Sequence, residues 1–188
     1  MDYGCQQVLI QDRKPVALLE YLCQQSNKVY NCPLDYARQV SFKTKRLVSY
    51  AQLCRERVRT KNKPFAAMHV SSAQQTCKSA AEALTSFKSL LQAQPDAKPR
   101  LPQYRKAGLF PVAYPKQWPK FQEGQVRVGK QVKAWFGLDA FWVQFPTHLQ
   151  WENIKELRIL PRHGVFYLEW VYAKSSQPQP LDPSDPTA

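Results

Sequence analysis

Helical periodicity marks the first half of the chain. After Asp12, the expected N-cap, apolar residues recur at spacings of three and four up to about Asn31. The positions on this predicted buried face are Leu18, Leu19, Leu22, Cys23, Val29 and Tyr30. Pro15 is tolerated in a first helical turn, whereas Pro33 disfavours continuation. We therefore expect the first helix to end before Pro33.

Two further helices are predicted before residue 95. Spacings of four, three and four predict a second helix over Leu47, Ala51, Cys54 and Val58. A third helix keeps the same rhythm for five turns and ends near Gln94. Its apolar positions are Ala73, Cys77, Ala80, Leu84, Phe87 and Leu91.

From about residue 107 the apolar positions recur with a period of two, which is typical of half-buried strands. The alternating positions are Val126 and Val128; Val132, Ala134 and Phe136; Phe141, Val143 and Phe145; and Leu157 and Ile159. Gly164 separates the last of these strands from an apolar run over 165–172, an arrangement that suits a hairpin.

One short strand, residues 5–11 (CQQVLIQ), precedes all the helices. A single strand is not stable alone, so we expect it to pair with strands beyond residue 107. The intervening residues, 12 to about 99, then form a helical insertion in a β-rich domain. The predicted fold class is α+β.

The formal net charge of +13 points to polyanionic partners, with nucleic acid the first to test. Residues 43–63 carry eight basic residues against one acid, Glu56. These are Lys43, Lys45, Arg46, Arg55, Arg57, Arg59, Lys61 and Lys63. Residues 98–133 carry nine against Glu123: Lys98, Arg100, Arg105, Lys106, Lys116, Lys120, Arg127, Lys130 and Lys133. A basic surface that only aids solubility is the alternative.

Aromatic residues are interleaved with the second basic stretch, where bases could stack on the rings while the cations hold phosphates. They are Tyr104, Phe110, Tyr114, Trp118 and Phe121. Core packing is the alternative for each, and it is favoured for Phe110 and Phe121, whereas the two readings are balanced for Tyr104 in its polar surroundings.

The sequence offers little for catalysis or metal binding. No C-x-x-C pair occurs among Cys5, Cys23, Cys32, Cys54 and Cys77, and His69, His148 and His163 lie far apart. Asp139, in GLDAF, lacks a second acidic partner. We expect no metal, no cofactor and no enzymatic activity. Without a signal peptide or an apolar span, we expect a cytoplasmic protein that does not enter membranes.

Five segments follow one another in a recognisable order. They are VYN (29–31), SYAQL (49–53), AQQTCKSAAEALTSF (73–87), KPRLPQYRK (98–106) and IKELRILPRHGVFYLEWVY (154–172). Together they resemble the N-terminal half of the TnpB (OrfB-type) proteins of insertion sequences, the RNA-guided DNA nucleases traditionally called transposases. The resemblance covers about residues 5 to 173.

The resemblance implies a small antiparallel β-barrel, the wedge domain, over residues 1–11 and 100–174. A helical recognition domain, residues 12–99, is inserted after the first strand, and 175–188 are expected to be a disordered tail. Family members continue into a RuvC-like nuclease domain with a G-[IV]-D-x-G strand and a later C-x-x-C zinc motif. Neither occurs here, and GLDAF precedes the last wedge strands with Phe141 in place of glycine, so Asp139 receives no catalytic role.

The resemblance also implies nucleic-acid-binding residues, with guide RNA and DNA as partners. Tyr50, Ser71, Ser72, Gln74 and Gln75 correspond to the part that reads a short DNA motif, and glutamine can pair bidentately with adenine. Helix capping and solvated surface are the alternatives for these serines and glutamines. Phosphate or backbone contacts are expected from Lys43, Lys45, Arg46, Arg55, Arg59, Arg100, Arg105 and Lys106, with Tyr104 beside them.

A truncated TnpB-like protein that binds guide RNA and target DNA without the nuclease domain is therefore the main hypothesis. The alternatives are a regulatory or structural fragment that pairs with a full-length TnpB-type protein, and the product of a decayed pseudogene.

Overall fold

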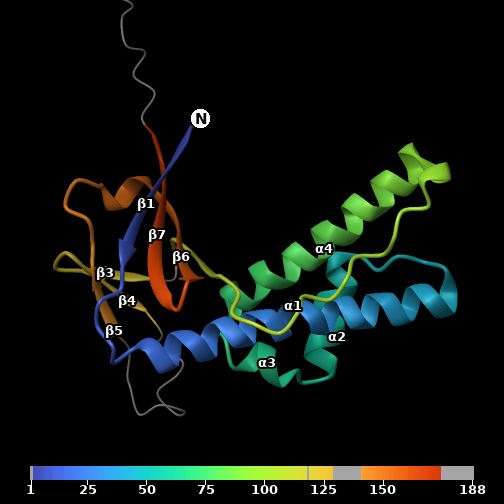
Figure 1. Cartoon of the computed structure of the whole chain (residues 1–188), viewed down its shortest axis with the longest axis horizontal. Helices are drawn as coiled ribbons and strands as arrows, with labels where there is room; N and C mark the ends of the chain where they lie inside the picture. Colours follow the sequence, from blue (N-terminus) through green and yellow to red (C-terminus); the bar gives the residue numbers. More distant parts are fainter. Residues whose placement is uncertain (1, 118, 129–140, 175–188) are drawn as a thin grey trace, which may run out of the picture.

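The structure is a computed structural model of the chain, and it describes residues 2–117, 119–128 and 141–174. One strand, β1 (Tyr3–Leu9), comes first. The helices follow: α1 (Val16–Thr44), α2 (Tyr50–Arg59), α3 (Lys63–Ala66), α4 (Val70–Ala93) and a 3-10 turn η1 (Pro95–Ala97). The remaining elements are β2 (Val112–Pro115), β3 (Lys120–Gln122), β4 (Gln125–Val128), β5 (Phe141–Gln144), a 3-10 turn η3 (Trp151–Asn153), β6 (Ile154–Arg162) and β7 (Val165–Ala173). The predicted α+β class is confirmed (Figure 1).

The strands form two antiparallel sheets, one in the order β1-β7-β6-β2 and one in the order β3-β4-β5. β1 pairs with β7, from Tyr3 opposite Ala173 to Leu9 opposite Tyr167. The predicted pairing of the first strand with a strand beyond residue 107 is therefore confirmed. No closed barrel is found within the described ranges, and the strand predicted at 132–136 lies outside them.

Two tight hairpins fix the register of the sheets. His163 (φ 49°) and Gly164 (φ 78°) join β6 to β7, and Glu123 (φ 50°) and Gly124 (φ 72°) join β3 to β4. Positive φ at both central positions is the type I′ geometry, whose twist matches that of the flanking strands. The hairpin predicted around Gly164 is confirmed.

The first helix is longer than predicted. α1 continues through Pro33 to Thr44, so the expected end near Asn31 is wrong. Proline removes one intrahelical hydrogen bond and crowds the preceding turn. However, the buried face continues past it with Leu34 and Ala37, which pack in a core with α4. This tertiary packing offsets the local cost of the proline.

The start of α1 also differs from the prediction. Its N-cap residue is Pro15, which makes no side-chain capping bond. Asp12 instead accepts a hydrogen bond at Oδ1 from the backbone N–H of Lys14 (2.9 Å). This contact stabilises the turn that precedes the helix, and Asp12 does not cap the helix itself.

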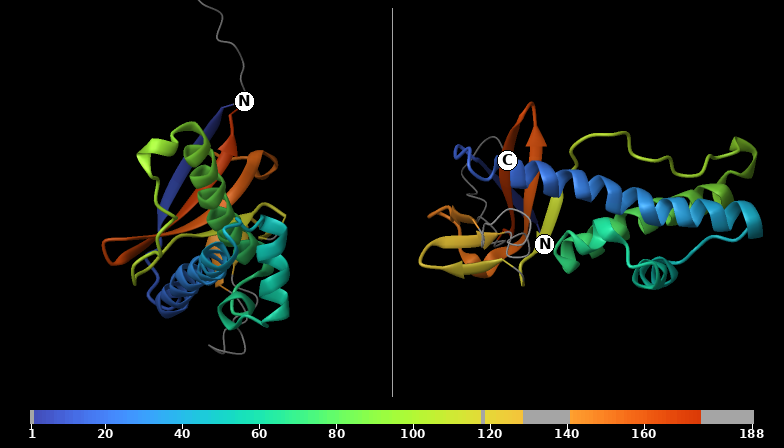
Figure 2. Two further views of the ribbon diagram at one scale, coloured as in Figure 1. Left: turned by 90° about the vertical axis from the view of Figure 1, so that its right-hand side faces the viewer. Right: turned by 90° about the horizontal axis from the view of Figure 1, so that it is seen from below.

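Two cores hold the elements together. The first joins the beginning of α1 to both sheets, and it contains Leu18, Leu22, Val126, Phe145, Leu157, Leu168 and Trp170. The second lies among α1, α2 and α4, and it contains Tyr30, Leu34, Leu53, Cys77, Ala80 and Leu84. Figure 2 shows the consequence: the helices extend away from the sheets, with the beginning of α1 at the sheets.

The chain returns from α4 to the sheets through an extended segment, residues 98–111, which we call the connector. It runs beside α1 in the opposite direction (Figures 1 and 2). The connector carries several of the predicted cations, so its surroundings decide which of them a ligand can reach.

Candidate nucleic-acid interface

Four of the five predicted motif-reading residues line one hollow of about 230 Å³. Tyr50 comes from the start of α2, whereas Ser71, Gln74 and Gln75 come from the first turns of α4. Spacings of three and four place these α4 residues on one helical face. The other lining residues are Lys78, Pro115 and Gln117. We call this the glutamine hollow.

The glutamine hollow is rich in groups that can both donate and accept hydrogen bonds. Gln74 is exposed and Gln75 half-buried, whereas most of Ser71 is buried. The backbone N–H of Ser71 donates to Nδ1 of His69, the N-cap of α4, at 3.3 Å. This cap fixes the first turn of α4, on which the polar side chains stand.

Ser72 does not join the other predicted residues. It is 0% exposed, and its Oγ has no hydrogen-bond partner within the described part of the chain. Helical geometry explains this placement, because Ser72 lies between Ser71 and the core residue Ala73 and turns toward the interior. A ligand in the glutamine hollow cannot reach Ser72 in this conformation.

Two polar residues of the glutamine hollow were not predicted from the sequence. Lys78 follows Gln74 by four residues on α4, so helical spacing could have found it. It also forms a long ion pair with Glu82, with 3.8 Å between Nζ and Oε1. Gln117 follows β2, and no local signal indicates that it approaches α4.

Three cations of the first basic stretch are exposed near the far end of α1. Lys43 lies in the last turn of α1, Lys45 is its C-cap with φ 58°, and Arg46 follows. Positive charge at a helix C-terminus also interacts favourably with the helix dipole, so these residues stabilise the helix as well. Arg55 is exposed on α2, whereas the side chain of Arg59 lies outside the description.

Amide side chains of α1 hold the backbone of the connector. Asn31 accepts from the Arg105 N–H at 2.9 Å and donates to the Arg105 carbonyl at 3.0 Å. Asn27 donates to the Lys106 carbonyl at 2.8 Å. One turn of helix separates the two asparagines, and each satisfies connector groups that make no backbone ladder.

The Arg105 side chain is enclosed between two rings. Its guanidinium carbon lies 3.7 Å from the ring centroid of Tyr30 and 4.8 Å from that of Phe110. Burial lowers the pKa of Arg105, although an arginine remains charged. Arg100 and Lys106, in contrast, are exposed. The structure thus separates the predicted connector cations into one enclosed and two accessible groups.

Tyr104 stands on the surface with a fixed hydroxyl. The residue is 46% exposed, and its hydroxyl donates to Oδ1 of Asp35 at 2.7 Å. This hydrogen bond is the main reason why the pKa of Tyr104 is raised. The Arg38 guanidinium lies 5.1 Å from the ring centroid. Of the other interleaved aromatics, Tyr114 is buried, Phe121 is partly exposed and Trp118 lies outside the described residues.

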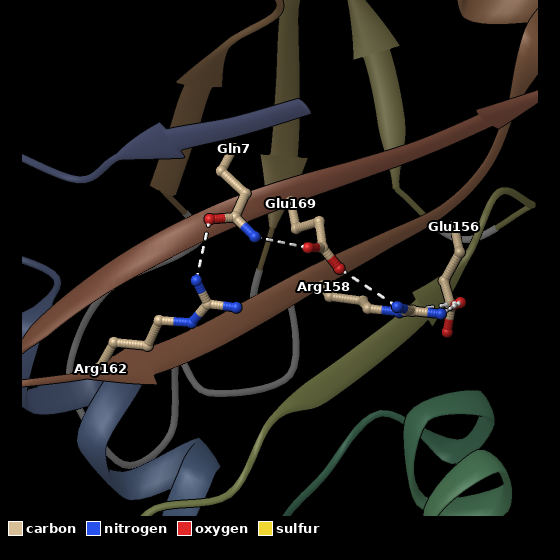
Figure 3. Close-up of polar contacts among 5 residues, drawn as sticks. All are labelled: Gln7, Glu156, Arg158, Arg162 and Glu169. Carbon is tan, nitrogen blue, oxygen red and sulfur yellow. Dashed lines mark hydrogen bonds and ion pairs between the residues drawn. The ribbon is translucent and has the colours of Figure 1, made fainter. Parts of the chain in front are cut away.

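The outer face of the larger sheet is charge-balanced (Figure 3). Glu169 accepts from Gln7 Nε2 at 2.7 Å and from Arg158 Nη1 at 3.1 Å. Arg158 also binds Glu156 at 3.0 Å, and Arg162 donates to Gln7 Oε1 at 3.1 Å. Two arginines face two glutamates, so this network adds no net charge that would attract phosphates.

The described ranges lack the features of a metal centre and of a membrane-spanning helix. Among these residues, no three or more His, Cys, Asp and Glu side chains gather in a group that could hold a metal ion. None of the described helices combines the length and the apolar character that crossing a membrane requires.

Comparisons of the sequence with protein-family models and with curated proteins find no match.

Proposed function

We propose that this chain binds nucleic acid, with the glutamine hollow contacting base edges and the exposed cations contacting phosphates. The observation that carries the proposal is the convergence of Tyr50, Gln74 and Gln75 with Lys78 and Gln117 in one hollow. Glutamine donates and accepts at once, which suits the paired groups that adenine presents in a major groove. Lysine adds attraction to the nearby backbone.

Within this proposal, the chain is a TnpB-like protein that binds guide RNA and DNA and does not itself cut DNA. The two sheets would correspond to the barrel of the wedge domain, and α1 to α4 to the inserted recognition domain. The pairing of β1 with β7 supports this correspondence. The strand before the helices pairs with a strand after them, as expected when helices are inserted into a β-rich domain. The other support is the order of the five segments that resemble the family.

A Gln74→Ala substitution tests the reading of bases. The preferred duplex is first selected from a randomised pool, and binding is then measured by fluorescence anisotropy against duplexes with single changes. Losing one base contact should reduce discrimination at one position by about 1 to 3 kcal/mol. Gln92→Ala is the matched control, since Gln92 is exposed on the same helix but far from the hollow. Unchanged discrimination in Gln74→Ala would contradict the proposed role.

A protein partner is the second candidate, and the outer face of the larger sheet favours it. Tyr3, Leu9 and Val165 are exposed apolar residues on β1 and β7, and the charges between them are balanced. Such a surface suits another protein, such as a full-length TnpB-type protein, better than a polyanion. Nucleic-acid binding that is weak and insensitive to salt would favour this candidate.

A further inference from the structure

An open groove of about 570 Å³ adjoins the glutamine hollow. Its described lining consists of Lys116, Gln117, Pro119, Lys120, Phe121 and Trp151. Gln117 lines both the groove and the glutamine hollow, so the two sites are neighbours. Apart from the shared Gln117, no described lining residue of the groove takes part in the proposed reading of duplex DNA.

A pair of stacked rings forms one wall of the groove. Phe121 of β3 and Trp151 of η3 have ring centroids 5.1 Å apart and an interplanar angle of 13°. The Phe145 ring lies nearly perpendicular to both rings, with centroid distances of 5.3 Å to Phe121 and 5.8 Å to Trp151. It also packs nearly perpendicular to the buried Trp170, at a centroid distance of 5.2 Å. The stacked pair is therefore anchored to the core of the molecule.

The anchored pair nevertheless remains accessible. Phe121 is 38% exposed, and all three residues of β3 are exposed. A large apolar ring held at the surface by a rigid neighbour loses little conformational freedom when a third ring stacks on it. The packing of Phe121 thus prepares a platform for a flat ligand.

Two lysines supply positive charge at the same groove. Lys116 donates from Nζ to the main-chain carbonyl of Glu152 at 2.6 Å, and an ammonium group has three donors. Lys120 is exposed next to Phe121. No carboxylate occurs among the described lining residues, so the groove suits an anion that carries a flat ring.

We propose that this groove binds one unpaired nucleotide of a single strand, with its base stacked on the Phe121–Trp151 pair and its phosphate near Lys116 and Lys120. A paired base has neighbours on both of its faces, so a base must leave the duplex before it can stack on protein rings. Stacking accepts every base, because each base has a flat face. The proposal deepens the proposed function and rests on it for the source of the strand, a duplex bound in the neighbouring hollow.

Binding of short single strands tests the groove without any duplex. Oligothymidylate is compared with a strand of equal length that lacks bases, so the phosphate charge is the same in both. Stacking should make the base-bearing strand bind about 5-fold to 150-fold more tightly. Phe121→Leu, which keeps an apolar side chain but removes the ring, should abolish this preference. Phe121→Tyr should retain it.

Two controls separate stacking from general damage. Phe42→Leu changes an exposed phenylalanine on α1, 60% exposed and far along the helix from the sheets, and should keep the preference. Lys120→Ala should weaken both strands and reduce the salt slope by about 0.7, whereas Lys88→Ala on α4 should not. A base preference that persists in Phe121→Leu would overturn the proposal, and so would its absence in the unaltered protein.

The result is independent of the duplex experiment. If duplexes show no base preference but the Phe121-dependent preference for base-bearing strands is present, the glutamine hollow is refuted and the groove stands. If duplex reading depends on Gln74 but single strands show no dependence on Phe121, the groove is refuted and the proposed function stands.

Discussion

Arg105 and Lys106 are neighbours in the sequence, yet their side chains meet different surroundings. The guanidinium of Arg105 is enclosed by Tyr30 and Phe110, whereas Lys106 is exposed. The faces of the two rings offset part of the hydration that the enclosed guanidinium loses. Arg105 therefore fixes the connector, and Lys106 remains free to meet a phosphate. The two residues have the same charge and different roles.

At the same scale, Asn31 is expected to control the order of the connector. Asn31→Ala removes both side-chain bonds to the Arg105 backbone and leaves a partly buried N–H and C=O without them. Such losses cost about 1 to 3 kcal/mol. We expect faster hydrogen exchange at the Arg105 amide and faster tryptic cleavage after Arg105 and Lys106.

Asn153→Ala provides the control for this prediction, because within the described ranges the Asn153 side-chain amide bonds only the exposed side chain of Gln150. It should leave the cleavage rate of the connector unchanged. Equal protection of the Arg105 amide in the Asn31→Ala variant and the unaltered protein would show that the side-chain bonds are dispensable.

At the scale of elements, Glu169 connects three strands. It is 7% exposed on β7 and accepts hydrogen bonds from Gln7 on β1 and Arg158 on β6. In Glu169→Gln, an amide NH₂ group replaces one carboxylate oxygen and faces the N–H donor of either Gln7 or Arg158. One of these two hydrogen bonds is therefore lost in a nearly buried site. We expect a loss of about 1 to 3 kcal/mol in the free energy of unfolding, measured by urea denaturation with an unchanged m-value.

The matched control is Glu82→Gln on α4. Glu82 pairs with Lys78 across an exposed helical surface, and such pairs contribute about 0.3 to 0.5 kcal/mol. If the two variants lose the same amount of stability, the network on the outer sheet face does not connect the strands as inferred.

Some elements of the fold could be predicted from the sequence, whereas the end of the first helix could not. The pairing of β1 with β7 was predictable because an isolated strand needs partners, and α4 because its apolar rhythm persists for five turns. The end of α1 was not predictable from the sequence. Pro33 is a strong local signal, but the core around Leu34 and Leu84 depends on α4, which lies far away in the sequence. Local signals fail where distant packing decides the outcome.

The same distinction applies to the candidate site. Four residues of α4 were expected at the motif-reading site from the resemblance alone: Ser71, Ser72, Gln74 and Gln75. The structure brings three of them to one hollow and buries Ser72. The enclosure of Arg105 and the stacking of Trp151 on Phe121 depend on contacts between remote segments. Residue type alone therefore identified the basic connector but could not separate its accessible cations from its enclosed one.

At the scale of the whole molecule, the accessible charge is unevenly distributed. Lys43, Lys45 and Arg46 lie at the far end of α1, and Arg100 and Lys106 lie on the connector beside this helix. The network on the outer face of the larger sheet is neutral. A bound nucleic acid is therefore expected to follow the helices and the connector, and to leave the outer sheet face uncovered.

The dependence of affinity on salt measures this arrangement. If each of these five cations neutralises one phosphate of a single strand, together they should contribute roughly −3.5 to the slope of log affinity against log salt. The slope is obtained from anisotropy titrations at several salt concentrations.

Lys106→Ala should make this salt slope shallower by about 0.7 and weaken all sequences equally, because phosphate contacts carry no base information. Arg105→Ala should change it much less, because its guanidinium is occupied by Tyr30 and Phe110. Equal changes in the two variants would show that Arg105 leaves its rings to bind phosphate, and a flat dependence in the unaltered protein would favour a protein partner instead.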